Sequence, residues 1–419
     1  MDSSSNHQET HPILIVLAIW TIEFLQCAIT KAIGVLLPVW KEQFESDART
    51  VGTAASLIMF MHLVGLTAQP LTKIFKARTV IMTCGVLSAA GLVLGSIAAN
   101  ITVLIFAMFL TGFSSMGNAI ALGIVPSYFT KQYTTVANIV TTGLPLSILS
   151  FAPITQLFID TYGWRGAMLL LGALNFHYVV AAALLRPPLE HTNQADMSYE
   201  CVSDSSDTET DNDSSNDGFL KTCLANIFNN SLLTNGPFLI VLLVSAVSGY
   251  IFNGLVVYLV SVAQSKGLSP HDAATVTTVS GIGMLFVRII MAIFQGKTSY
   301  RHLFYIGSIL AVTSYTGMYF ANSFATLCLA SFTIGAAYGI LGSQVFIGVY
   351  ETAGQEDAIN AIACAHILIG VGYLSCGYIS GWLYDISGSF HYSLIGLSAV
   401  SSLVMLTLGI EDMWHVLSR

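Results

Sequence analysis

Charged side chains are scarce in this 419-residue chain. Asp, Glu, Lys and Arg make up 9% of the residues, hydrophobic side chains make up 54%, and the mean hydropathy is +0.72. This composition excludes an ordinary soluble globular protein, in which about a quarter of the residues are charged. Because a membrane-spanning helix needs about 20 mostly apolar residues, the chain is long enough for about a dozen spans.

The chain also lacks the spacings that mark metal sites, disulfide frameworks and hydrolytic enzymes. Its seven cysteines form no CxxC pair and lie mostly in apolar runs: Cys27, Cys84, Cys201, Cys223, Cys328, Cys364 and Cys376. We expect them to pack as apolar residues. The sequence shows no HExxH motif, paired intramembrane Asp or Ser-Lys arrangement. We therefore expect no enzyme, no metal and no cofactor.

Acidic charge is concentrated in one segment. The net charge is −8, yet residues 187–221 alone hold nine acids and one base, so the remainder is balanced. This balance makes nucleic acid an implausible partner. The stretch 203–217 has almost no apolar residues, so we expect a disordered linker there. The polar N-terminus lacks Lys and Arg, which indicates that the first apolar run is a span and not a signal peptide.

Apolar runs of spanning length form two groups of six. They lie at 13–38, 51–71, 79–98, 102–126, 134–158, 164–185, 237–263, 272–294, 303–320, 324–350, 358–380 and 392–410. The pattern predicts an all-α membrane protein with twelve transmembrane helices in two six-helix halves. The predicted division is a tail at 1–12, a half at 13–186, an acidic cytoplasmic linker at 187–236, a half at 237–410 and a tail at 411–419.

Lys and Arg are unevenly distributed between alternate loops. If the N-terminus is cytoplasmic, the inner segments hold nine of these residues and the outer segments hold four. The positive-inside rule then places both termini and the acidic linker in the cytoplasm. An arrangement of six spans, a linker and six spans is typical of transporters whose two halves rock about a site near the middle of the membrane.

The segment from the fourth span to the linker carries a string of motifs. It contains Tyr128-Phe129, Lys131, Ala137-Asn138, Gly143, Tyr162 to Gly166 and Arg186-Pro187. Lys31 with the following Gly34-Val35, and the stretch from Gly381 to Gly388, belong to the same set. Together they resemble the monocarboxylate transporter family of the major facilitator superfamily over nearly the whole chain.

The resemblance implies the major facilitator fold, a plasma-membrane location and alternating-access transport of small organic solutes. The implied solutes are monocarboxylates or related carboxylate-bearing metabolites such as aromatic amino acids. A single-span accessory subunit is a further partner of some family members. Asn138 and Phe346 match positions at which the family lines its substrate path, and we expect them to bind substrate here. For Phe346 the alternative is an aromatic residue that faces lipid or packs in the core.

The chain also departs from the family pattern. Members with proton coupling carry an Asp four residues before the Arg of span eight, whereas here Arg288 is kept and Met284 occupies the Asp position. The entrance motif of span one is missing, and Thr134 stands where a basic residue would precede Asn138. These departures leave proton-coupled and uncoupled transport open as alternatives.

Three permanently ionisable side chains fall well inside the predicted spans: Glu23, Lys31 and Arg288. Each costs roughly 2.5 to 3.5 kcal/mol at the bilayer centre, so each is expected to have a partner or a role. Glu23 and Lys31 lie about 12 Å apart along one helix and are not a direct pair. We expect Lys31 and Arg288 to converge on one central cavity and to bind a monoanion such as a carboxylate. The alternative is that both are static partners of helix carbonyls or of Glu23.

Three side chains are candidates for coupling. Glu23 is an acid within a span, while His62 and His366 titrate near neutral pH and could replace the missing Asp. Hydrogen-bonded packing is the alternative for each histidine, and hydration near a membrane surface is the alternative for Glu23.

Two functional hypotheses follow. The first is a secondary transporter of small organic anions or zwitterions, with the lipid bilayer as its surroundings. The second is a transporter-like sensor or binding partner that no longer transports and acts through its acidic linker. The intramembrane cations favour the first, because the second gives no reason for their cost.

Overall fold

The computed structural model describes residues 12–61, 75–129, 136, 139–185, 234–294 and 298–417. All regular elements in these residues are helical, and ten of the helical stretches are long and apolar enough to cross a membrane. The predicted all-α membrane fold is therefore confirmed. The acidic linker lies outside the described residues.

The first half runs from α1 to α11. Its helices are α1 (Pro12–Gln43), α2 (Ala48–Phe60), α5 (Ala77–Ser96), α6 (Ile101–Thr111), α7 (Phe113–Gly123), α8 (Val125–Tyr128), α10 (Gly143–Asn175) and α11 (His177–Leu184). Helix α6 begins at Asn100, whose side chain accepts a hydrogen bond from the backbone N–H of Val103 at 3.0 Å. Such a cap satisfies one of the free N–H groups at a helix start.

The second half runs from α15 to α20. Its helices are α15 (Gly236–Asn253), the π-helical turn η1 (Gly254–Tyr258), α16 (Leu259–Ser265), α17 (Pro270–Phe294), α18 (Tyr300–Phe320), α19 (Phe324–Ser387) and α20 (His391–Leu417). Helix α19 begins with a capping box in which Ser323 and Thr326 bond each other's backbone N–H groups. It ends at Gly388, whose φ of 67° is readily adopted by glycine.

Two of the long helices contain a break that divides them into two spans. Gly163 in α10 has φ 69° and ψ 171°, and Gly354 in α19 has φ 78° and ψ 173°. Both breaks fall within gaps that the sequence predicts, at 159–163 and 351–357. The second span is described only over the 13 residues of α2, so the count of twelve spans stays a prediction.

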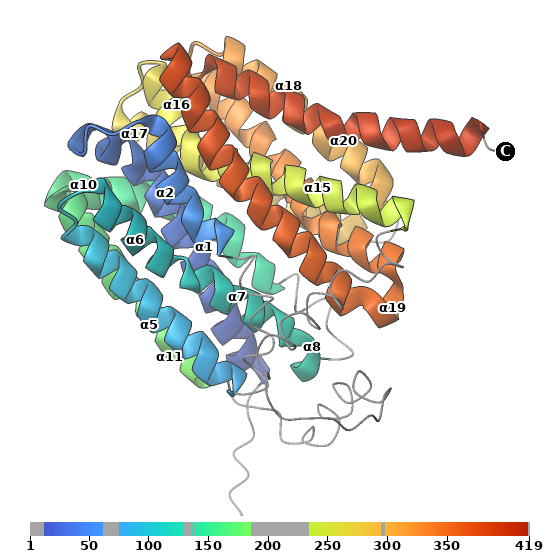
Figure 1. Cartoon of the computed structure of the whole chain (residues 1–419), viewed down its shortest axis with the longest axis horizontal. Coiled ribbons are helices and arrows are strands. Elements are labelled where there is room, and N and C mark those ends of the chain that lie inside the picture. The colour runs from blue at the N-terminus through green and yellow to red at the C-terminus, as the bar shows by residue number, and fades with distance from the viewer. Residues whose placement is uncertain are drawn as a thin grey trace, which may run out of the picture.

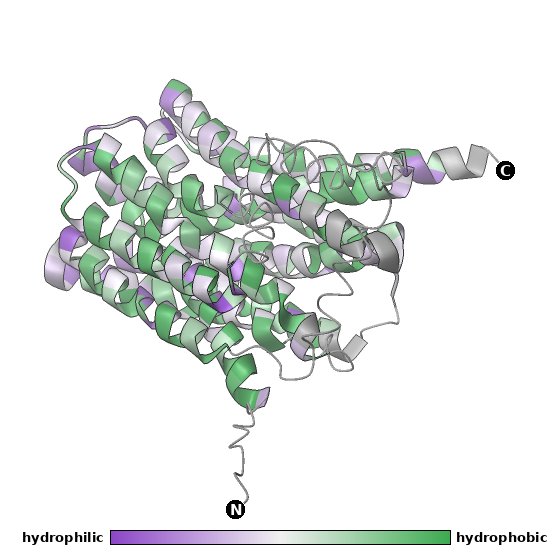
Figure 2. Cartoon of the chain, turned by 60° about the horizontal axis from the view of Figure 1, so that its bottom comes forward, coloured by the Kyte–Doolittle hydropathy of each residue, from purple (hydrophilic) through white to green (hydrophobic). Residues whose placement is uncertain are grey.

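The two halves lie side by side as two bundles (Figure 1). Helices α5, α6, α7 and α11 gather on one side, and α15, α18, α19 and α20 gather on the other. We call the end of the molecule where α1 ends, α2 begins, α19 ends and α20 begins the closed end; the opposite end, where α11 ends and α15 begins, is the linker end. Hydrophobic residues cover most of the helical surface between these ends (Figure 2), as a lipid-facing surface requires.

Glycines bring the two halves into backbone contact towards the closed end. A Cβ on Gly281 of α17 would lie 2.7 Å from the Leu149 backbone nitrogen of α10, and a Cβ on Gly52 of α2 would lie 2.9 Å from the Gly377 oxygen of α19. Gly34 of α1 lies against the backbone of Val256 in η1. Small residues permit such close helix approach in membranes, and here they let the backbones of the two halves meet.

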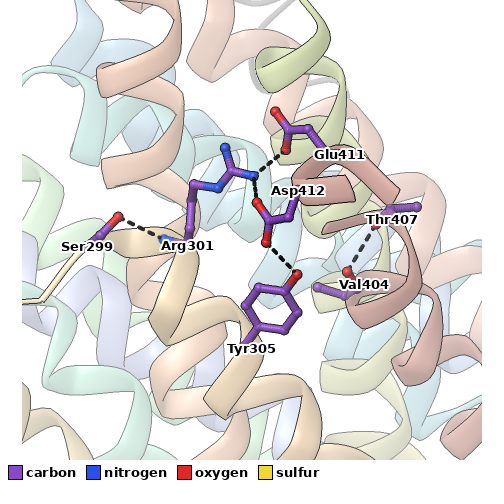
Figure 3. A network of polar contacts seen from close by, with 7 residues as sticks. All are labelled: Ser299, Arg301, Tyr305, Val404, Thr407, Glu411 and Asp412. Carbon is purple, nitrogen blue, oxygen red and sulfur yellow. Dashed lines mark hydrogen bonds and ion pairs between the residues drawn. The ribbon is translucent and has the colours of Figure 1, made fainter. Parts of the chain in front are cut away.

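A polar network ties α18 to α20 within the second half (Figure 3). The Arg301 guanidinium lies 2.7 Å from a carboxylate oxygen of Glu411 and 2.7 Å from one of Asp412. The Tyr305 hydroxyl donates a hydrogen bond to the second Asp412 oxygen at 2.9 Å. These contacts hold the part of α20 that continues beyond the predicted span end at residue 410.

Candidate functional site

Lys31 lies at the boundary between the halves and is completely buried, with 0% of its surface exposed. Its ammonium donates a hydrogen bond of 3.0 Å to the backbone oxygen of Val256 in η1. Within the described residues no acidic group forms an ion pair with it. A charged donor on a carbonyl is stronger than a neutral one, so Lys31 ties α1 to the seventh span.

Glu23 lies two helical turns nearer the linker end on α1 and is also buried, at 5% exposure. One carboxylate oxygen accepts a hydrogen bond of 2.7 Å from the Asn118 amide of α7. The other is 3.8 Å from the Cys27 sulfur. Because a buried carboxylate is costly without compensation, its remaining stabilisation must come from charge at longer range.

That charge is Arg288 of α17. The two side chains interact electrostatically without forming a direct ion pair. The partly buried Arg288 guanidinium donates from Nη1 to the backbone oxygen of Thr141, in the segment preceding α10. Its Nε is buried and has no hydrogen-bond partner among the described residues. Arg288 therefore retains binding capacity that the described protein groups do not fill.

Glu23 and Arg288 lie within electrostatic range of each other, and the depth of Lys31 relative to Arg288 follows from their positions in α1 and α17. Lys31 lies 12 residues from Gln43 at the closed end of α1, and Arg288 lies 18 residues from Pro270 at the closed end of α17. At 1.5 Å per residue these depths are about 18 Å and 27 Å. On this estimate Lys31, which is bound to the Val256 oxygen, lies nearer the closed end than Arg288. The expected convergence of the two cations on one cavity stays a prediction.

Three aromatic side chains of the second half pack against one another near Arg288. The Phe252 ring of α15 packs on the Tyr338 ring with centroids 4.4 Å apart, and on the Tyr373 ring at 5.8 Å. Tyr338 also interacts electrostatically with Arg288. Apolar walls with few polar groups are typical of small-molecule sites.

The remaining predicted site residues are placed only in part. Phe346 and His366 face each other across the two arms of α19, with ring centroids 5.1 Å apart. Phe346 is 39% exposed, and the His366 Nδ1 lies 3.0 Å from the Ile362 oxygen. Asn138 and His62 lie outside the described residues.

Sequence reasoning missed Asn118, Tyr338 and Phe252. Asn118 is a buried amide within a span, and such a residue requires a polar partner in lipid. That signal could have identified it. The two aromatic residues carry no comparable signal, since the chain has 17 Tyr and 23 Phe.

Comparison with known proteins identifies relatives along most of the chain. The model of the Major Facilitator Superfamily matches residues 19–269. Monocarboxylate transporter 12 of Mus musculus is 23% identical over 414 residues, covering 94% of this chain and 84% of that protein. Monocarboxylate transporter 13 of Rattus norvegicus is 27% identical over 393 residues, covering 91% and 84%.

Solved structures share the fold. A bacterial homolog of the human lysosomal transporter Spinster, in an inward-facing and occupied conformation, superposes with a TM-score of 0.71 at 12% identity, covering 95% of this chain and 96% of that one. A mutant of the nucleoside transporter NupG gives a TM-score of 0.71 at 14% identity, covering 94% and 99%. The predicted resemblance is confirmed: this chain belongs to the Major Facilitator Superfamily, and it is a multi-pass membrane transporter similar to the monocarboxylate transporters.

Proposed function

We propose that this transporter carries small organic monoanions or zwitterions with a carboxylate group, by alternating access, and that Arg288 binds the carboxylate. The observation that carries the proposal is the state of the Arg288 side chain. Its guanidinium is bound by one backbone carbonyl, its Nε is unpartnered among the described residues, and no described carboxylate lies within ion-pair distance. A guanidinium can grip a carboxylate through two parallel hydrogen bonds.

Glu23 completes the proposed site as the compensating charge. It interacts electrostatically with Arg288 from the opposite half. A bound substrate carboxylate would compete for the same guanidinium and repel an ionised Glu23. If transport is proton-coupled, we therefore assign coupling to Glu23, because Met284 cannot titrate. We further propose a plasma-membrane location, as the family resemblance implies, with both termini cytoplasmic, as the loop charges predict.

Uptake of labelled lactate, an aromatic amino acid and creatine in oocytes at two external pH values tests the proposal. Arg288→Gln is expected to reduce saturable uptake to below about a hundredth of wild type, because each charge-assisted hydrogen bond contributes about 1.5 to 3 kcal/mol. Arg288→Lys keeps the charge without the planar fork and should raise the apparent KM. Acid-stimulated uptake that persists in Glu23→Gln would remove Glu23 from coupling.

Arg165→Gln is the matched control. Arg165 also donates to a backbone carbonyl, that of Ala98 at 2.9 Å, and lies over the Trp164 ring, but it is remote from Glu23 along the membrane normal. Its uptake should stay close to wild type at equal surface expression. If Arg288→Gln transports normally, or alters only folding and partner binding, the carrier proposal fails and the sensor hypothesis gains.

A further inference from the structure

The motif at the end of the eleventh span, Gly381 to Gly388, is not used by the proposed substrate site. Its Asp385 lies in the last turn of α19, in the second half. One carboxylate oxygen accepts a hydrogen bond of 2.8 Å from the backbone N–H of Ala48, and the other accepts one of 2.9 Å from the backbone N–H of Arg49. These are the first two residues of α2, in the first half.

Helix α2 has an N-cap residue of its own that does not cap it. Asp47 occupies the N-cap position, yet its side chain makes no capping hydrogen bond. Its carboxylate lies 3.9 Å from the Arg49 guanidinium instead. Two of the free N–H groups that every helix start leaves are thus satisfied by a carboxylate from the other half of the molecule.

The carboxylate of Asp385 is more stable when the two halves meet at the closed end than when they separate there. An acid at a helix C-terminus meets the negative end of the helix dipole, whereas an acid at a helix N-terminus meets the positive end. Asp385 lies at the unfavourable end of α19 and at the favourable end of α2. If the halves separate at this end, Asp385 loses both donors and keeps the unfavourable position.

Two further contacts between the halves lie close to Asp385 in α19. Gly381, one turn before Asp385, lets α19 approach so closely that a Cβ there would be 2.6 Å from the Ala48 oxygen. The Lys41 ammonium of α1 lies 3.9 Å from the centre of the Tyr384 ring. A contact shifts an equilibrium between two states only if its free energy differs between them. The Asp385 contact differs in this way, because it exists only while the closed end is shut.

We propose that Asp385 is a positioning residue that caps α2 across the two halves and thereby holds the closed end shut during the transport cycle. Its removal should raise the ratio of open to closed molecules at this end about tenfold, which corresponds to about 1.4 kcal/mol. The inference does not depend on the identity of the substrate.

The test measures distances between spin labels on the two halves at the closed end. Labels are attached through non-canonical amino acids at Glu42 of α1 and Tyr392 of α20, both exposed, in the full-length transporter in nanodiscs. Asp385→Ala should show a long-distance population about tenfold more abundant than in wild type. Asp385→Asn, which keeps an acceptor but loses the charge, should give an intermediate value.

Asp47→Ala is the matched control, because Asp47 is an acid at the same helix start without a capping bond. It should leave the distance distribution within about twofold of wild type. An unchanged distribution in both Asp385 variants, or an equal shift in Asp47→Ala, would overturn the proposal. If Asp385→Ala does not fold, the distance distributions of Asp385→Asn and Asp47→Ala are compared, and a larger shift in Asp385→Asn supports the proposal.

Discussion

Lys31 shows how the surroundings of a residue change the role that its type suggests. It is a fully buried ammonium whose hydrogen bond to Val256 joins the two halves. Burial of a charge costs several kcal/mol, and a hydrogen bond to a charged group offsets about 1.5 to 3 kcal/mol of that. The net effect of Lys31 on stability is therefore small or unfavourable, which points to a role in the transport cycle.

Lys31→Met separates the two roles that a buried lysine could have here. Methionine keeps a long apolar stem without the charge, so thermal stability should be unchanged or higher. If Lys31 acts by tying the halves, the maximal uptake rate should fall about fivefold or more while the apparent KM stays within about twofold. A KM raised about tenfold at an unchanged maximal rate would instead place Lys31 on the substrate, as the sequence predicts.

For single residues, the sequence was sufficient to locate the charged side chains within the spans, but not the groups that they bind. Glu23, Lys31 and Arg288 stand out because each interrupts an apolar run. Two of their partners are the backbone oxygens of Val256 and Thr141, and every residue has such an oxygen. Only tertiary structure determines which carbonyl a long side chain reaches.

Helix α17 and helix α10 pack against each other across the two halves, and Gly281 lies where their backbones come close. A Cβ on Gly281 would lie 2.7 Å from the Leu149 nitrogen and 3.0 Å from the Pro145 oxygen. Both atoms belong to the backbone, so they cannot rotate away as a side chain could. Closure at this level therefore depends on the absence of a side chain at residue 281.

Gly281→Val should prevent this close approach and reduce uptake to below about a tenth of wild type, since overpacking costs roughly 1 to 3 kcal/mol. Gly317→Val is the control, because a Cβ on Gly317 of α18 would meet no atom within 4 Å. It should retain normal uptake at matched surface expression. Equal losses in both variants would show that the helices respond to branching at Cβ and not to the contact between halves.

The helices were predictable to different degrees. Long apolar runs predict the spans, and polar gaps predict the breaks at Gly163 and Gly354. The π-helical turn η1 and the separation of α6 from α7 at Gly112 have no counterpart in hydropathy, because both sides of each are apolar. Their positions depend on packing against other helices.

The whole molecule has a clear polarity between its two ends. The acidic segment joins the halves between α11 and α15, and α1 starts at the same end. Epitope tags at the N-terminus and in the segment 203–217 should therefore stain only in permeabilised cells, whereas a tag inserted after Glu45 should stain intact cells. The excess of Lys and Arg in the linker-side loops is the physical reason. Staining of the linker tag on intact cells would reverse the predicted orientation.

The π-helical turn η1 has a consequence for the phase of the seventh span. A π turn takes up one residue more than an α turn, which offsets the side-chain stripes before and after it by about 100°. Before the turn, Asn253 donates to the Tyr373 oxygen of α19; at its end, the Tyr258 hydroxyl donates to the Gly377 oxygen, next to Gly52 of α2. The one extra residue in η1 thus suffices to turn the Tyr258 side chain towards the boundary between the two halves, without lengthening the span beyond the bilayer.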